Sequence, residues 1–353
     1  MNSFGSSFRV SLFGESHGPA VGALVDGCPP GLALDVADFE ADLARRRGGP
    51  AGSARTGTAG TAGAAGATPR AEADVPEILS GLYRGHTTGT PILILFRNED
   101  TRSGDYEAFL SVPRPGHADL TGKQRYLGYA DPRGGGHFSG RITVGLVAAG
   151  VIAKALLPGL SFRTSILEAG GRKDVEAACE EARAAGDSVG ALVEIRVDGA
   201  RAGLGEPFFG AVESRIAEAL FAVPGVRGVE FGDGFRAAAM RGSEHNDPIV
   251  SADGRTAKNG SGGVNGGVTN GNEIVVRAAM KPTSTIARPQ RTLDLDSGTE
   301  ALLEGKGRHD ACIAIRGAVA LEAAVAIALA DLAIIARGHD HALRGQLRDR
   351  STP

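Results

Sequence analysis

Residues 311–336, ACIAIRGAVALEAAVAIALADLAIIA, form a long apolar stretch near the end of the 353-residue chain. The stretch contains Arg316, Glu322 and Asp331, and charged residues at such spacing disfavour a bilayer-spanning helix. A second apolar stretch, residues 142–157, is too short to span a bilayer and contains Lys154. Both stretches therefore predict helices buried in a protein core, and such helices need cover on most sides.

Strand and helix patterns mix along the rest of the chain. Predicted strands are 8–13, 20–26, 77–83, 91–96, 189–197 and 273–280, and predicted helices are 35–47, 141–157, 207–222 and 311–336. Asp35 is the expected N-cap of the first helix, and the run PILILF at 91–96 predicts a strand buried on both faces. No linker divides the chain, so the residues alone predict one domain, 1–353, of α/β or α+β class.

Composition narrows the class of protein. The chain is 42% hydrophobic and 22% charged, which is typical of a soluble globular protein, and no signal peptide is evident. The net charge of −3 and the aromatic content of 5% disfavour a nucleic-acid-binding protein. Three cysteines, Cys28, Cys179 and Cys312, stand far apart, which disfavours a disulfide framework or a zinc site and indicates a reducing, cytoplasmic location.

Two segments have little capacity to form a core. Residues 48–68 are mostly Ala, Gly, Ser and Thr, and predict a mobile loop over 48–73 that closes over a substrate as a lid. Residues 338–353 form a polar C-terminal tail. The tail includes the sequence GHDH at 338–341, which is more typical of a surface than of a metal site.

Common catalytic motifs fail on inspection. Ser16 and His17 are adjacent, and neighbouring side chains of an extended segment point to opposite faces, so a Ser–His dyad is unfavourable. Gly135 and Gly140 have the spacing of a phosphate-binding loop, but Arg141 stands where that motif needs lysine. No strand–GxGxxG–helix unit is present, which disfavours a Rossmann nucleotide site.

What remains is a scattered set of groups suited to proton transfer and anion binding. His17 lies in GESHG, His117 in RPGHAD and Asp310 in GRHD. Histidine exchanges protons near neutral pH, and an aspartate beside cations can serve as a base. Arginines and glycine-rich loops nearby in sequence favour a small anionic ligand.

Taken together, these segments resemble the chorismate synthase family. The matching segments, in family order, are FGESHGPAVGALVDGCPPGL, RRR, TTGTPI, RPGHAD, RGGG, GVEFGDGF, GGVNGGVTNGNEIVVRAAMKPTSTI and GRHDACIAIR. The resemblance implies an α+β fold, a β-α-β sandwich with core helices enclosed by antiparallel sheets, assembled as a homotetramer. It also implies a lyase of aromatic amino-acid biosynthesis, at the last step of the shikimate pathway.

The implied reaction is a 1,4-anti elimination of phosphate from 5-enolpyruvylshikimate 3-phosphate (EPSP), which gives chorismate. Reduced FMN is required although there is no net redox change. Some family members reduce flavin with NADPH, but 353 residues leave no room for a reductase domain, so we expect a separate NAD(P)H-dependent flavin reductase. Neither a nucleic acid, a membrane nor a metal is expected as a partner.

The resemblance also implies roles for individual residues. His17 matches a histidine that protonates near the leaving phosphate or flavin N1, and His117 matches a second proton-delivering histidine. Asp310 matches the aspartate that deprotonates flavin N5, while Ser16 and Ser139 match serines that support these transfers. Arginine forks bind carboxylates and phosphate, and the expected substrate-binding arginines are Arg46, Arg47, Arg114 and Arg133.

The implied flavin contacts are His137, Phe138, Ser139, Pro224, Gly225, Gly266, Lys281, Pro282, Thr283, Ser284, Thr285 and Arg308. Many family members have Arg-Ser-Ser-Ala-Arg where this chain has His137 to Arg141, so His137 replaces an arginine. That departure and the altered 48–73 segment leave one alternative open, a flavin-binding relative that has lost catalysis. Retention of His17, His117 and Asp310 argues against that alternative.

Overall fold

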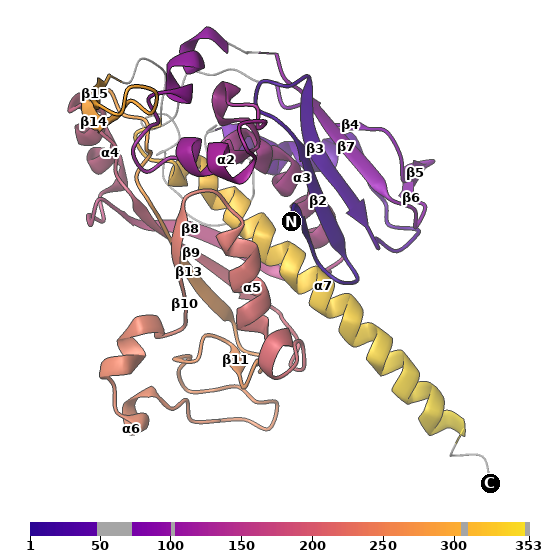
Figure 1. Ribbon diagram of the computed structural model, residues 1–353. Coiled ribbons are helices and arrows are strands. Elements are labelled where there is room, and N and C mark those ends of the chain that lie inside the picture. Colours follow the sequence, from indigo (N-terminus) through magenta and orange to yellow (C-terminus); the bar gives the residue numbers. More distant parts are fainter. Residues whose placement is uncertain (48–72, 100–102, 305–309, 350–353) are drawn as a thin grey trace.

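The computed structural model describes residues 1–47, 73–99, 103–304 and 310–349, with the side chains of 103–105, 107 and 339–349 excluded. The expected lid at 48–73 therefore lies outside the described residues except for Ala73. Figure 1 shows two sheets on either side of a long diagonal helix, α7 (Ala314–Asp349). This arrangement of mixed helices and antiparallel sheets is the predicted α+β sandwich.

The first sheet has five antiparallel strands in the order β1-β2-β3-β7-β4. Their bounds are β1 (Ser3–Phe4), β2 (Arg9–Gly14), β3 (Ala20–Asp26), β4 (Glu77–Ile78) and β7 (Ile92–Arg97). The hairpin of β2 and β3 confirms the strands predicted at 8–13 and 20–26. GESHG is the turn of this hairpin, so His17 lies between the end of β2 and the start of β3.

Two strand predictions in this region are wrong in detail. β7 alternates buried and half-buried residues, because only one of its faces packs on helix α3 (Thr143–Ala155). The strand predicted at 77–83 is divided into β4 and β5 (Leu82–Tyr83). β5 pairs with β6 (His86–Thr87) in a separate hairpin, so the apolar residues of 77–83 serve two sheets.

The second sheet has four antiparallel strands in the order β10-β13-β9-β8. They are β8 (Ser161–Ala169), β9 (Ala191–Asp198), β10 (Val226–Phe231) and β13 (Ile274–Met280). β9 and β13 confirm the strands predicted at 189–197 and 273–280. β8 and β10 were not predicted, because their residues are mostly exposed or half-buried and carry no apolar run.

Helices fill the space between the sheets. α3 packs on β2, β3 and β7, and α7 packs on α3, on α5 (Val212–Phe221) and on strands β8 and β9. The helix predicted at 311–336 begins at Ala314 and continues to Asp349, so most of the expected polar tail is a helical extension. The helix predicted at 207–222 begins only at Val212, after a 3₁₀ turn, η5 (Phe208–Gly210).

The first predicted helix starts where its capping residue indicates. Asp35 accepts a hydrogen bond from the N–H of Ala37, and Asp38 accepts one in return from the N–H of Asp35. A 3₁₀ turn, η1 (Val36–Phe39), leads into α1 (Glu40–Arg47). α1 ends in three arginines with different partners: Arg45 donates to Glu322 of α7, Arg46 to Asp74 and Arg47 to Glu40.

Smaller elements complete the described chain. They are η2 (Ser103–Leu110), α2 (Asp119–Arg125), η3 (Arg133–Phe138), η4 (Gly140–Ile142), α4 (Val175–Ala184), η6 (Gly234–Ala239), α6 (Gly242–His245), β11 (Val264–Asn265), β12 (Val268–Thr269), β14 (Gln290–Leu293) and β15 (Glu300–Leu303).

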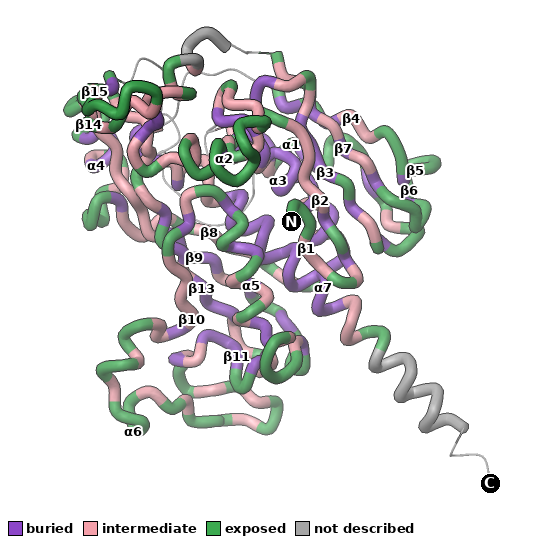
Figure 2. The backbone as a smooth tube through the Cα atoms, viewed as in Figure 1, coloured by how far each residue is buried: buried purple, intermediate pink, exposed green. Residues whose placement is uncertain are grey.

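The acidic residues of α7 explain why so apolar a helix belongs to a protein core. The helical segment Ala314–Gly338 is long and apolar enough to cross a membrane, yet 83% of its most apolar window is buried inside the molecule (Figure 2). Glu322 accepts hydrogen bonds from Arg45 of α1 at 2.7 and 2.9 Å and from Thr164 of β8 at 2.6 Å, and it also pairs with Lys154 of α3. Its charge therefore joins four elements across the core.

Asp331 has a comparable role at the other end of the core. Its carboxylate accepts hydrogen bonds from the backbone N–H groups of Ser6, Ser7 and Phe8, at 2.6 to 3.0 Å. These groups belong to the bend between β1 and β2. The carboxylate thus ties the N-terminal sheet to α7.

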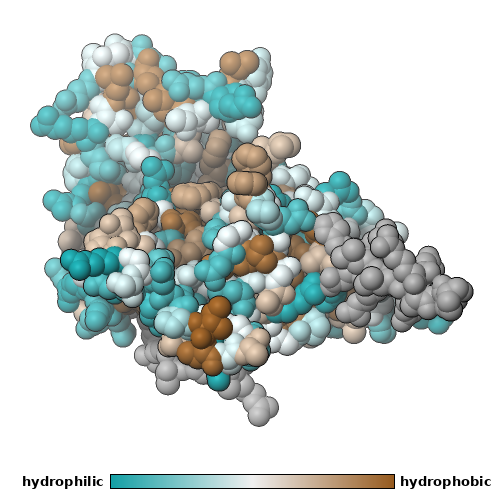
Figure 3. Space-filling view, turned by 90° about the horizontal axis from the view of Figure 1, so that it is seen from below, coloured by the Kyte–Doolittle hydropathy of each residue, from teal (hydrophilic) through white to brown (hydrophobic). Residues whose placement is uncertain are grey.

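The outer surface carries several large apolar side chains. Phe208, Phe209, Phe235 and Ile249 are each at least 74% exposed. Figure 3 shows small apolar groups separated by polar ones on one face of the molecule. The three cysteines, by contrast, are all buried and none forms a disulfide.

Candidate active site

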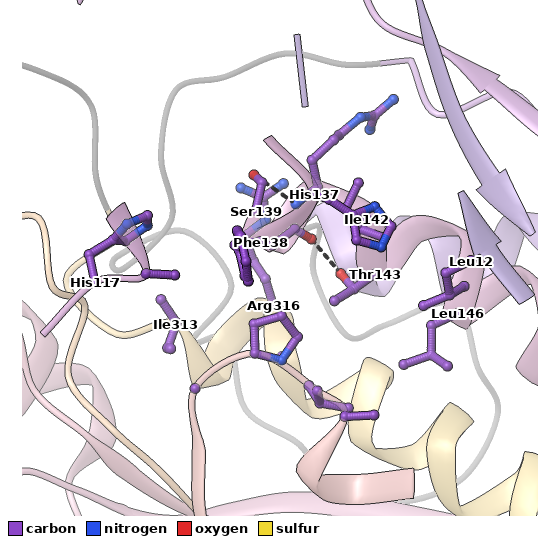
Figure 4. A pocket seen from close by; sticks show the side chains of 18 of the residues that line it. Leu12, His117, His137, Phe138, Ser139, Ile142, Thr143, Leu146, Ile313 and Arg316 are labelled. Carbon is purple, nitrogen blue, oxygen red and sulfur yellow. Dashed lines mark hydrogen bonds between the residues drawn. The ribbon is translucent and has the colours of Figure 1, made fainter. Parts of the chain in front are cut away.

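A cavity of about 910 Å³ lies where the start of α7 meets the glycine-rich segment η3, the start of α3 and residues 280–285 (Figure 4). Five cationic side chains line it, and Asp310 is the one carboxylate among the described lining residues. The cations are Arg46, Arg114, Arg141, Lys281 and Arg316. Three histidines, His17, His117 and His137, also line the cavity. The cavity therefore combines an excess of positive charge with several groups that can transfer protons.

The RGGG segment separates the first two histidines. Gly134 has a φ of +61°, and a Cβ built on it would lie 2.4 Å from Cδ2 and 2.6 Å from Nε2 of His17. A Cβ on Gly135 would lie 3.6 Å from Nε2 of His117. Only glycine fits at position 134, because both the backbone angle and the contact with His17 exclude a side chain.

The His17 ring lies against Gly134 of this segment. Its ring meets the ring of Tyr106 edge-on, with 5.1 Å between centroids, and the residue is largely buried. The adjacent Ser16 is fully buried and does not line the cavity, but its backbone N–H donates to the Gly136 carbonyl at 3.1 Å. Ser16 therefore anchors the glycine segment to the hairpin turn that carries His17.

His117 belongs to a compact group of polar side chains. Its Nδ1 lies 2.6 Å from Oδ1 of Asp119, and Arg114 donates to both oxygens of Asp119 at 2.7 and 2.8 Å. Burial alone would raise the pKa of Asp119, but the hydrogen bonds from Arg114 and His117 outweigh it and hold that pKa well below its usual range. Arg114 also donates to Thr285 at 3.1 Å.

Asp119 is a residue that our sequence analysis did not select. It stands in the quoted motif RPGHAD, two positions after His117. A carboxylate so near a candidate catalytic histidine is the signal that would have identified it.

Asp310 lies across the cavity at the start of α7. One of its carboxylate oxygens is 3.9 Å from Nη1 of Arg316, and its backbone carbonyl accepts a hydrogen bond from Thr283 at 2.7 Å. Lys281 donates to Ser284 at 2.9 Å and to the Gly116 carbonyl. Burial and the nearby Arg227 lower the pKa of Lys281. The 281–285 segment thereby connects Asp310 to the loop that carries His117.

The buried arginines share one carboxylate. Arg46 donates to Asp74 at 2.9 Å, and Arg141 donates to the other oxygen of the same carboxylate. Two guanidinium groups against one carboxylate leave a net positive charge in the cavity wall. Arg141, which we did not select, thus stands beside Arg46, which we did.

Several predicted site residues lie elsewhere. Arg47 pairs with Glu40 and donates to the Ala73 carbonyl, and Arg133 pairs with Asp131 at 2.7 Å. Neither lines the cavity, because each finds an acceptor nearer its own backbone. Gly266 lies in the turn between β11 and β12, also outside the cavity lining, and Arg308 is outside the described residues.

The other predicted cofactor residues do line the cavity. They are His137, Phe138, Ser139, Pro224, Gly225, Lys281, Pro282, Thr283, Ser284 and Thr285. The Nδ1 of His137 lies 2.7 Å from the Gly14 carbonyl, which only accepts, so Nδ1 carries the proton. Ser139 caps η4 through a hydrogen bond from the N–H of Arg141.

Comparison with known proteins finds the same family that the sequence motifs resemble. Residues 8–334 match the family model described as chorismate synthase. A chorismate synthase of Chitinophaga pinensis is 53% identical over 336 residues, which cover 95% of this chain and 97% of that protein. One from Aeropyrum pernix is 46% identical and covers 95% of this chain and 93% of that protein.

The fold is also shared with a solved structure. A structure described as "Crystal Structure of Chorismate Synthase" superposes with a TM-score of 0.68 at 24% identity. The similarity covers 93% of this chain and 92% of that one.

Proposed function

This chain belongs to the chorismate synthase family, and we propose that it eliminates phosphate from EPSP to form chorismate, with reduced FMN as cofactor. One observation supports this most. His17, His117 and Asp310 come from three distant segments of the chain, and all three line one cavity whose other charged lining groups are cationic.

The cavity suits a substrate with three anionic groups. EPSP carries two carboxylates and a phosphate, and guanidinium groups bind both kinds of anion through paired hydrogen bonds. Arg46, Arg114, Arg141, Lys281 and Arg316 supply the cations. We assign Arg141 and Arg316 to the substrate set, in the positions we first gave to Arg47 and Arg133.

The residues present also fit a flavin. Phe138, Tyr126, Met280 and Ile313 give the cavity apolar walls suited to a fused ring system, and Lys281 offers a cation for a phosphate. We propose that residues 281–285 and Pro224–Gly225 hold FMN. When bound, reduced FMN supplies electron density for cleavage of the C–O bond.

Side chains of the protein itself donate and accept the protons of the reaction. We propose that His17 delivers a proton at the leaving phosphate, and that His117 would hold a proton on Nε2 for the reduced flavin and so balance the charge of that cofactor. Asp310 accepts the proton that leaves C6 of the substrate, so that one C–O and one C–H bond break and a second ring double bond forms. Proton transfer by positioned groups contributes roughly 10²–10⁴-fold to a rate.

We further propose a cytoplasmic homotetramer served by a separate NAD(P)H-dependent flavin reductase. Phe208, Phe209, Phe235 and Ile249 are each at least 74% exposed, and such an assembly would cover exposed apolar side chains of this kind. Sedimentation of the purified protein tests the assembly. Oxidation of NADPH by the purified protein with FMN would contradict the separate reductase.

The activity is tested anaerobically with EPSP and chemically reduced FMN. We expect chorismate in the reaction mixture, identified by chromatography, and none with oxidised FMN. Binding of both ligands without product would instead indicate the flavin-binding relative that has lost catalysis.

A further inference from the structure

We propose that Asp119 is a positioning residue that fixes the proton of His117 on Nδ1 and so directs Nε2 into the cavity. The inference deepens the proposed function, because it states how one of its proton-transfer groups is held ready. It rests on the contacts among Arg114, His117 and Asp119.

Two neighbours compete for Nδ1 of His117. Asp119 Oδ1 lies at 2.6 Å and Arg114 Nη2 at 3.0 Å. Arginine only donates and an ionised carboxylate only accepts, so the two neighbours demand opposite states of Nδ1. One of the two contacts cannot be a hydrogen bond to this nitrogen.

The Asp119 carboxylate determines whether Nδ1 of His117 carries a proton. With its pKa held far below the usual range, Asp119 is ionised, and a bare nitrogen 2.6 Å from it would place two lone pairs in contact. A proton on Nδ1 turns the same contact into a charge-assisted hydrogen bond. Arg114 needs no acceptor on the ring, because it donates to Asp119 at 2.7 and 2.8 Å and to Thr285 at 3.1 Å.

Nε2 is then the nitrogen available for chemistry. It faces Gly135, on which a built Cβ would still lie 3.6 Å from this nitrogen, and His117 itself lines the cavity. In the neutral ring this nitrogen holds a lone pair, and in the charged ring it holds the proton that can be delivered. Asp119 itself does not line the cavity, so it acts through His117.

The test uses the full-length protein labelled with ¹⁵N-histidine, studied by solid-state NMR, with H117Q to assign the His117 signals. In the neutral ring we expect Nδ1 protonated and Nε2 bare. In D119N, whose amide can turn a donor toward the ring, we expect this preference to be lost and kcat to fall roughly 10²-fold, with KM for EPSP changed less than about threefold. D119E, which keeps two acceptor oxygens, should retain the Nδ1 proton and recover most of kcat.

The control is D26N, which removes the carboxylate of an exposed Arg9–Asp26 pair and should change neither readout. A wild-type His117 protonated on Nε2 would overturn the proposal, as would D119N with wild-type spectra or wild-type kcat. If D119N does not fold, the wild-type and D119E spectra still show which nitrogen of His117 carries the proton. The spectra need no substrate, so the expected tautomer in a protein that forms no chorismate would reject the proposed function and leave the positioning role standing.

Discussion

At the scale of single residues, the contact between Gly134 and His17 is the tightest constraint on the site. We expect G134A to reduce activity by at least about 10²-fold, because its Cβ would displace the His17 ring from 2.4 Å away. The matched control is G128A, since Gly128 also has a positive φ, +82°, but has open space around it. Both variants carry the backbone cost of positive φ, and only G134A should lose activity; equal losses in kcat/KM would contradict the account.

Substitution of Arg316 and of Arg133 tests whether an arginine must line the cavity to bind the substrate. Arg316 lines the cavity beside Asp310, whereas Arg133 pairs with Asp131 outside it. We expect R316Q to raise KM for EPSP about 10- to 100-fold, the range of one lost charge-assisted hydrogen bond, and R133Q to leave KM nearly unchanged. Steady-state kinetics at saturating reduced FMN measures both. A larger effect from R133Q would restore our original assignment of that arginine.

Residue types and motifs were enough to identify His17, His117 and Asp310, because each stands in a distinctive local sequence. They were not enough to choose among arginines. Arg47 and Arg141 look alike in sequence, and only the packing shows that one turns toward Glu40 while the other shares Asp74 inside the cavity wall. Asp119 was missed although it stands two positions after His117, because its role depends on the direction of its side chain.

At the scale of elements, the close crossing of α3 and α7 depends on a missing side chain. A Cβ on Gly150 would lie 2.4 Å from Cβ of Ala323. We expect G150A to destabilise the protein by about 1–3 kcal/mol, despite the better helix propensity of alanine, because the two helices must move apart.

Gly338, on α7 with nothing near its Cβ position, provides the control. We expect G338A to be neutral or stabilising by up to about 1 kcal/mol. Urea denaturation of both variants measures the difference. A stabilised G150A would show that the helices cross less closely than described here.

Helices were easier to predict than strands. The apolar runs of α3 and α7 are long and continuous, whereas β8 alternates Arg163, Ser165 and other polar residues on its outer face. Half of such a strand lies at a partly exposed surface, so its stability comes from pairing with β9 rather than from its own composition.

At the scale of the whole molecule, Glu322 makes the stability of the packed layers depend on pH. Burial would raise the pKa of Glu322, but Arg45 and Lys154 outweigh it and lower the pKa from 4.5 to about 2. A carboxyl with a depressed folded-state pKa contributes stability above its unfolded pKa and loses that contribution as pH falls toward the folded value. The contribution of Glu322 is therefore complete above about pH 5 and declines between about pH 4.5 and 2.

We expect E322Q to lower the free energy of unfolding at pH 7 by about 3–5 kcal/mol, because Arg45 and Lys154 lose their shared partner. The difference from wild type should shrink as the pH is lowered through 4. E77Q, which breaks the exposed Glu77–Arg97 pair, should have little effect. Urea titrations at several pH values measure the free energy of unfolding of each variant. A difference between wild type and E322Q that grows as the pH falls would contradict this prediction.

The sandwich architecture was predictable only in part from composition. Two long apolar helices required cover on several sides, and two sheets supply it, but the partner strands of each sheet come from distant segments. The resemblance to the chorismate synthase family provided that architecture, and the match at residues 8–334 supports it.

One measurement tests the central claim most directly, a single-turnover, rapid-quench reaction under anaerobic conditions with excess enzyme and reduced FMN. We expect wild type to release phosphate and chorismate in equal amounts. H17A, H117A and D310A should still bind EPSP but turn it over at least about 10²-fold more slowly. Wild-type enzyme that binds EPSP and reduced FMN without releasing phosphate, or variants that match its rate, would contradict the account.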